Sequence, residues 1–73
     1  MSEKKAIPDY LERVIIEYAE LKAKVAVLAK MLAGEQPKFV SDKQWDLLNE
    51  QHTHMTRYQT VLWQRITDSL MNL

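Results

Sequence analysis

Seven apolar side chains recur at alternating steps of three and four residues between Asp9 and Leu32, a stretch with no glycine or proline. They are Leu11, Val14, Tyr18, Leu21, Val25, Leu28 and Leu32. This heptad spacing puts all seven on one face of an α-helix, so the pattern predicts a helix over residues 8–32 with one apolar seam. Ile15, Ile16, Val27 and Met31 lie off that seam. Apolar residues on a second face indicate that the helix has more than one neighbour.

A second apolar seam follows a short break at residues 33–40. The break contains Gly34, just past the last periodic residue, where a left-handed residue commonly ends a helix. Ser41 and Gln44 fit a capping box and predict that a second helix begins near residue 41 and continues to about 71. Its seam is expected to comprise Trp45, Leu48, His52, Met55, Gln59, Leu62, Ile66, Leu70 and Leu73.

The two helices predict an all-α fold, an antiparallel two-helix hairpin that forms a single domain over residues 1–73. Packing the two seams together would leave Ile16, Val27, Val61 and Trp63 uncovered. A chain of 73 residues without cysteine has a small core and no disulfide to reinforce it. We therefore expect the hairpin to be stable only as a homo-oligomer larger than a simple dimer.

Charge and hydropathy narrow the classes of function. Ten basic and ten acidic residues give a net charge of 0, whereas proteins that bind duplex nucleic acid usually carry a positive excess. A small anionic ligand needs only a few local cations, so neutrality is compatible with one. The chain has no signal peptide pattern and no apolar run long enough to span a membrane, which predicts a cytosolic protein.

The sequence offers no catalytic constellation. His52 and His54 are two residues apart and would point in different directions on a helix, so we expect no metal site there. Nucleophile motifs and phosphate-binding glycine loops are missing from the sequence, which predicts a protein that is not an enzyme and needs no cofactor. Any anion site must therefore be built from side chains and helix ends.

Arg65 and Tyr10 are the side chains with the clearest binding chemistry. The guanidinium of Arg65 matches phosphate oxygens, and Ser69 lies one helical turn later with a hydroxyl donor. Around a symmetry axis, one Arg and one Ser per chain would form a ring of donors. The ring of Tyr10 lies near a helix N-terminus and could stack on a nucleobase. The alternatives are an ion pair of Arg65 with Asp68 or a partner chain, and packing of Tyr10 on a neighbouring hairpin.

The chain resembles the phage small helical-hairpin family that contains the anti-CBASS cyclic-oligonucleotide sponges, whose hairpin is shared with a class of Thoeris-inhibiting sponges. The resemblance covers about residues 10–70. It is carried by Glu20-Leu21 with Lys24, then Leu47-Leu48, Gln51, Met55, Tyr58, Leu62 and Arg65-Ile66.

The resemblance implies a homo-oligomer, a hexamer in the family, that sequesters cyclic nucleotides such as cGAMP or cyclic tri-AMP in the cytoplasm of the infected bacterium. It implies a cyclic dinucleotide site with Tyr10 on a base and Lys24, or Lys22 as its substitute, on phosphate. It also implies a cyclic trinucleotide site with Arg65 and Ser69, where Ser69 replaces a threonine of the family.

Two other functions remain open from the sequence. The first is an oligomeric adaptor or inhibitor hairpin that binds a host protein through the apolar surface around Val61 and Trp63. The second is a regulatory coiled coil that binds nucleic acid, which the zero net charge disfavours.

Overall fold

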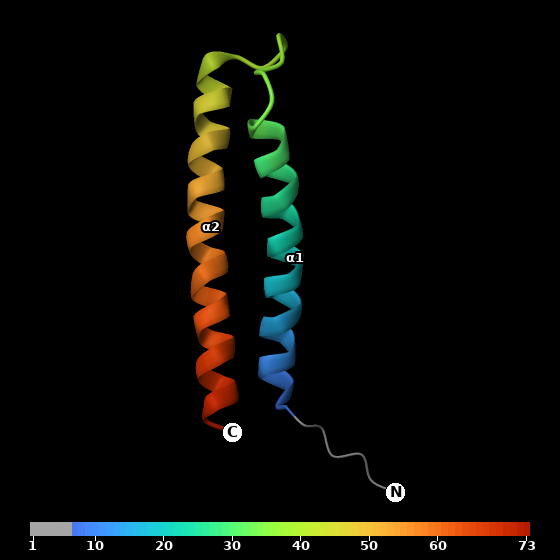
Figure 1. Ribbon diagram of the computed structural model, residues 1–73, viewed down its shortest axis with the longest axis vertical. Helices are drawn as coiled ribbons and strands as arrows, with labels where there is room; N and C mark the ends of the chain where they lie inside the picture. Colours follow the sequence, from blue (N-terminus) through green and yellow to red (C-terminus); the bar gives the residue numbers. More distant parts are fainter. Residues whose placement is uncertain (1–6) are drawn as a thin grey trace, which may run out of the picture.

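The computed structural model describes residues 7–73, which form two α-helices joined by one loop. Helix α1 comprises Asp9–Leu32 and helix α2 comprises Asp42–Met71. The helices run antiparallel, so that the start of α1 lies beside the end of α2 (Figure 1). The predicted all-α hairpin is confirmed.

Helix α1 begins where the sequence changes from a proline to acidic residues. Pro8 has an extended backbone, and its carbonyl oxygen accepts hydrogen bonds from the N–H groups of Leu11 and Glu12, both at 3.1 Å. Acidic residues lie in the first turn and Lys30 lies in the last turn. This order opposes the helix dipole at both ends and therefore stabilises the helix.

The end of α1 differs from the expectation for Gly34. Neither Gly34 nor any other residue in 7–73 has a positive φ, and Ala33 keeps a right-handed helical backbone. The N–H of Gly34 instead donates a hydrogen bond to the carbonyl of Met31 at 3.2 Å. This bond spans three residues, so the last turn is tighter than an α-helical turn and gives a carbonyl at the helix end a partner. The predicted left-handed cap is wrong because this bond ends the helix without a reversal of φ.

The start of α2 confirms the predicted N-cap. The side-chain oxygen of Ser41 accepts a hydrogen bond from the backbone N–H of Gln44 at 3.1 Å. Gln36 adds a contact that the sequence did not reveal. Its side-chain amide donates to the carbonyl of Val40 at 2.8 Å and to the carboxylate of Asp42 at 3.0 Å. The loop is therefore fixed to the first turn of α2 by a side chain from within the loop.

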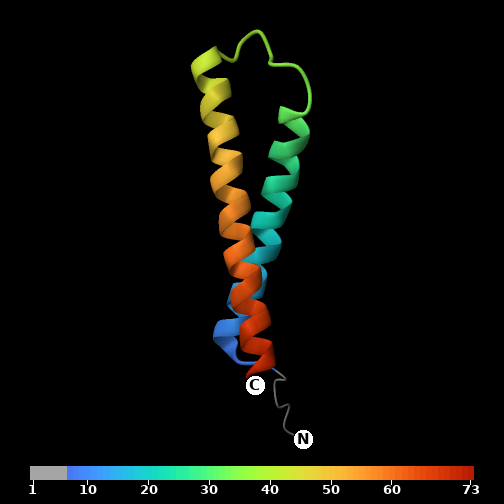
Figure 2. The ribbon, with the colours of Figure 1, turned by 60° about the vertical axis from the view of Figure 1, so that its left-hand side comes forward.

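The core lies toward the open end of the hairpin, opposite the loop, where α1 begins and α2 ends (Figure 1). Leu11 and Val14 of α1 pack there with Leu62 and Ile66 of α2. The rings of Tyr18 and Trp63 meet beside this cluster, with centroids 5.5 Å apart and planes tilted by 37°. The ribbons lie further apart toward the loop (Figure 2). Packing is thus densest at the open end.

The first seam is buried or half-buried at all seven positions, and the second is buried or half-buried as far as Ile66. Beyond Ile66 the second seam was assigned wrongly, because Leu70 is 47% exposed and Leu73 is 64% exposed. The three-residue step from Ile66 leads to Ser69, which is half-buried. Ser69 takes the seam position because Leu70 is turned about 100° further around the helix.

The four apolar residues expected to lack cover are indeed exposed in the single chain. Val27 is 70% exposed, and Ile16, Val61 and Trp63 each expose about half of their surface. Within residues 7–73, neither helix combines the length and the apolarity that crossing a membrane would require.

Candidate functional site

Three side chains recur at seven-residue intervals along one side of α1: Tyr10, Glu17 and Lys24. Seven residues are almost two turns, so these side chains lie on one face, about 10 Å apart along the axis. All three are exposed. The face therefore presents an aromatic ring, a carboxylate and an ammonium group in that order.

A contact between Glu17 and Tyr58 places α2 relative to this face. The hydroxyl of Tyr58 donates a hydrogen bond to the carboxylate of Glu17. This hydrogen bond is the main reason that the pKa of Tyr58 is raised above its ordinary value of 10.0, and partial burial and the charge of Glu17 act in the same direction. The positive charge of Arg65 opposes them and lowers the pKa of Tyr58, so Arg65 acts on the same surface.

Arg65 lies level with Tyr10 at the open end of the hairpin. Arg65 follows Tyr58 by seven residues on α2, and Tyr10 precedes Glu17 by seven residues on α1. Because the helices are antiparallel, these equal steps from the Glu17–Tyr58 contact reach the same level. None of residues 7–73 forms a hydrogen bond or ion pair with the side chain of Tyr10 or Arg65. Both groups are thus available to a ligand.

Ser69 and Lys22 are placed differently from the other candidates. Ser69 lies one turn after Arg65 but is half-buried at the edge of the contact between the helices. Lys22 is exposed, two residues before Lys24, and therefore turned about 200° from it around α1. Lys24 shares the face with Tyr10, whereas Lys22 does not.

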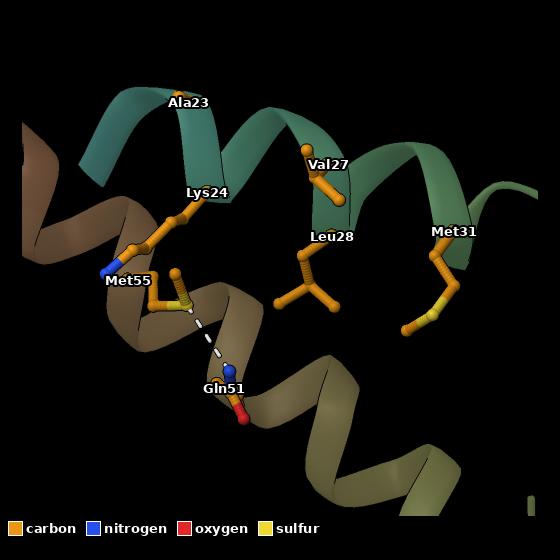
Figure 3. Close-up of a pocket in the computed structure, with 7 residues that line it drawn as sticks. All are labelled: Ala23, Lys24, Val27, Leu28, Met31, Gln51 and Met55. Carbon is orange, nitrogen blue, oxygen red and sulfur yellow. Dashed lines mark hydrogen bonds between the residues drawn. The ribbon is translucent and has the colours of Figure 1, made fainter. Parts of the chain in front are cut away.

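Lys24 lies at the border between two hollows of the hairpin surface. Toward the loop is a largely apolar groove of about 440 Å³, here called the methionine groove (Figure 3). It is lined by Ala23, Lys24, Val27, Leu28, Met31, Gln51 and Met55. Toward the open end is the acidic hollow, of about 260 Å³, lined by Glu17, Glu20, Leu21, Lys24 and Tyr58. Lys24 therefore has acidic neighbours on one side and apolar neighbours on the other.

Apart from Lys24, the groove residues were not foreseen as a site. Gln51 and Met55 were expected only as features of the family resemblance, and Met55 also as a seam residue. Gln51 and Met55 line the groove because of the register of α2 against α1, which determines the residues that lie opposite Lys24 and Leu28. The heptad pattern gives the face of each helix but leaves this register undefined.

The distance between Tyr10 and Lys24 limits what one chain can do. Fourteen residues of helix separate them, which corresponds to about 21 Å along the axis. A ligand that contacts both side chains on the same chain would have to span most of this distance. A ligand placed between two chains could contact a Tyr10 and a Lys24 without spanning it.

The family model for Sequestin matches residues 8–68, so the chain belongs to the Sequestin family. The match includes Tyr10, Lys24 and Arg65 and ends one residue before Ser69. No curated protein and no solved structure matches the chain.

Proposed function

We propose that this member of the Sequestin family is a phage immune-evasion protein that binds cyclic oligonucleotide second messengers without cleaving them. Removal of the free messenger would block CBASS-type defence in the cytoplasm of the infected bacterium. The family name denotes sequestration. The observation that carries the proposal is the exposed face that holds Tyr10, Lys24 and Arg65, since stacking rings and unpaired cations are what a nucleotide ligand requires.

In the cyclic dinucleotide site, the ring of Tyr10 would stack on a base and Lys24 would bind phosphate. The separation of about 21 Å along α1 supports a site in which these two roles belong to different chains. This explains why sequestration would require a homo-oligomer, with the hexamer of the resembled sponges as the expected form. Lys24 is preferred over Lys22 because Lys24 lines both the methionine groove and the acidic hollow, whereas Lys22 lines neither of them.

In the cyclic trinucleotide site, Arg65 and Ser69 from three chains would surround a three-fold axis. Three guanidinium groups match three phosphates, and each Arg–phosphate pair can form two parallel hydrogen bonds. Ser69 is only half-buried, so its hydroxyl can reach a ligand at the edge of the seam. The net charge of zero is no obstacle, because symmetry concentrates a few cations at one point.

The test is a calorimetric titration of the protein with cyclic di-AMP, cGAMP and cyclic tri-AMP. We expect tight binding of at least one of them, and chromatography of the ligand released by denaturing the protein should recover it intact. Lys24→Ala should weaken cyclic dinucleotide binding by tenfold or more, since one charge-assisted hydrogen bond contributes about 1.5–3 kcal/mol. Lys22→Ala is the matched control because it removes the same charge from another face. Equal losses in the two variants would argue against a specific Lys24 site.

A second candidate function is an adaptor or inhibitor hairpin that binds a host protein. The observation in its favour is the apolar surface that the single chain leaves exposed at Val27, Val61 and Trp63. Absence of heat with every cyclic nucleotide, from a protein shown to be folded, would favour this function over sequestration.

A further inference from the structure

The methionine groove is open to an entering ligand and combines apolar walls with two polar side chains. The side chains of Leu28 and Met31 extend from α1 toward α2, while Met55 and Gln51 face them from α2 (Figure 3). Its volume of about 440 Å³ is in the range of small-molecule sites. Polarisable thioethers pack well against aromatic rings. The groove is thus suited to a flat ring that carries a polar edge.

The charges on the two sides of Lys24 determine the direction in which an anion bound to Lys24 can extend. On the open-end side of Lys24, the carboxylates of Glu17 and Glu20 line the acidic hollow and repel phosphate. On the loop side, the methionine groove contains no acidic side chain. A nucleotide whose phosphate is held by Lys24 therefore places its base more favourably in the methionine groove than in the acidic hollow.

Gln51 has an amide that can be redirected toward a ligand. Within residues 7–73, its only side-chain hydrogen bond is the one that its Nε2 donates to the sulfur of Met55 at 3.6 Å. Thioether sulfur is a weak acceptor, so this bond can be exchanged for one to a base at little cost. Figure 3 shows the Gln51 amide on α2 beside Met55, and the side chain of Lys24 extends from α1 to the other side of Met55.

We propose that the methionine groove holds one base of the cyclic dinucleotide whose phosphate Lys24 binds, and that Gln51 hydrogen-bonds to the polar edge of that base. The inference rests on the proposed function and adds the base-recognition part of the same site. An amide carries both donors and an acceptor and can turn over about its terminal torsion. Gln51 can therefore form hydrogen bonds with adenine, guanine or uracil, so the groove can hold different bases.

The first test uses the methyl signals of the methionines in NMR spectra of the full chain, with cyclic di-AMP as the probe. Met31 and Met55 line the groove, whereas Met71 lies at the far end of α2 and is the internal control. We expect the signals of Met31 and Met55 to shift on ligand addition, through the ring current of the base, and that of Met71 to stay unchanged. Signals of Met31 and Met55 that respond to dilution of the protein but not to ligand would overturn the proposal and identify a second copy as the occupant.

The second test separates base recognition from phosphate binding. Gln51→Glu keeps the size of the side chain, but the ionised carboxylate has hydrogen-bond acceptors and no donor. It therefore repels the N1 acceptor of adenine and can accept hydrogen bonds from the N–H groups of guanine. We expect cyclic di-AMP to bind at least tenfold more weakly to Gln51→Glu than to the wild type, and the ratio of cyclic di-GMP to cyclic di-AMP affinity to rise. Gln64→Glu adds the same charge to α2 at an exposed position outside the groove and is the matched control.

The outcomes distinguish the two proposals. A wild-type protein that binds no cyclic nucleotide contradicts the proposed function itself. A wild type that binds, together with a Gln51→Glu variant that keeps the wild-type order of affinities, contradicts only the role of Gln51. Gln51→Met should weaken all cyclic dinucleotides alike, and light scattering should show the wild-type mass for every variant compared.

Discussion

At the scale of single residues, the hairpin surface is organised by charge around Lys24 and Arg65. Lys24 borders the acidic hollow, and Arg65 lies near the Glu17–Tyr58 pair. Neither cation has a hydrogen bond or an ion pair within residues 7–73. Since the fold does not use these charges, their removal should affect binding far more than stability.

Replacement of Arg65 by alanine should abolish cyclic trinucleotide binding while the protein remains folded. Loss of about 1.5 kcal/mol at each of three phosphates corresponds to a loss of affinity on the order of a thousandfold. Calorimetry with cyclic tri-AMP measures this loss, and thermal unfolding followed by circular dichroism checks the fold. Arg57→Ala is the control, because Arg57 is equally exposed but about 12 Å further from the open end. Unchanged affinity in Arg65→Ala would reject the site.

The Tyr58–Glu17 bond should make stability depend on alkaline pH. The pKa of Tyr58 is raised in the folded protein, mainly by the hydrogen bond to Glu17. The protonated hydroxyl therefore stabilises the fold fully below its ordinary pKa of 10.0, and this contribution is lost as pH rises through the higher folded pKa. Wild type and Tyr58→Phe should accordingly differ in Tm at pH 8, and the difference should shrink as pH rises above 10.0. A difference in Tm that does not change with pH across the ionisation of Tyr58 would contradict this origin.

At the scale of elements, the two helix ends in the loop are closed by different local interactions. Helix α1 ends through a backbone bond to Met31, whereas α2 begins with the side chain of Ser41 as its cap. The loop between them is held by Gln36. An alanine substitution should therefore raise the free energy of unfolding at the end of α1 and lower it at the start of α2.

Gly34→Ala should stabilise the protein. Gly34 has no positive φ, and a Cβ atom there would meet only the carbonyl oxygen of Met31 at 3.6 Å, an ordinary contact. The added methyl group restricts the unfolded chain without straining the fold, which contributes about 0.4–1 kcal/mol to the free energy of unfolding. Urea unfolding measures this gain.

Ser41→Ala is the contrasting variant at the other end of the loop. It removes the acceptor of the Gln44 N–H and should lower the free energy of unfolding by about 0.5–2 kcal/mol. A loss of stability in Gly34→Ala would mean that residue 34 adopts a positive φ in solution, as the sequence pattern suggested.

At the scale of the whole molecule, the sequence predicted the hairpin well because both seams and the Ser41 cap depend on local spacing. It failed at Leu70 and Leu73, because the half-buried seam position after Ile66 is taken by the polar residue Ser69, which an apolar pattern does not select. Arg65 and Tyr10 were binding candidates from their own chemistry, whereas a role for Lys24 was expected only from the family resemblance. The Glu17–Tyr58 contact and the methionine groove depend on how α2 is aligned with α1, which single-helix periodicity does not determine.

The surface that the hairpin leaves exposed predicts which substitution would weaken the expected assembly while leaving the core contacts within one chain in place. Val61 exposes about half of its surface and lies outside the core cluster of Leu11, Val14, Leu62 and Ile66. An aspartate at position 61 keeps its charge in water in the single chain, but an interface would have to bury it at a cost of several kcal/mol. Light scattering should therefore show a smaller assembly for Val61→Asp than for the wild type.

The matched control for this prediction is Thr56→Asp, which adds the same charge at an exposed polar position about 140° around α2. It should retain the wild-type mass. Cyclic nucleotide binding should fall together with assembly in Val61→Asp, because a site that needs Tyr10 and Lys24 from different chains cannot form on a separate hairpin. A wild-type protein that scatters as a single chain yet binds cyclic dinucleotides tightly would contradict the shared site, since about 21 Å of helix separates the two residues within one chain.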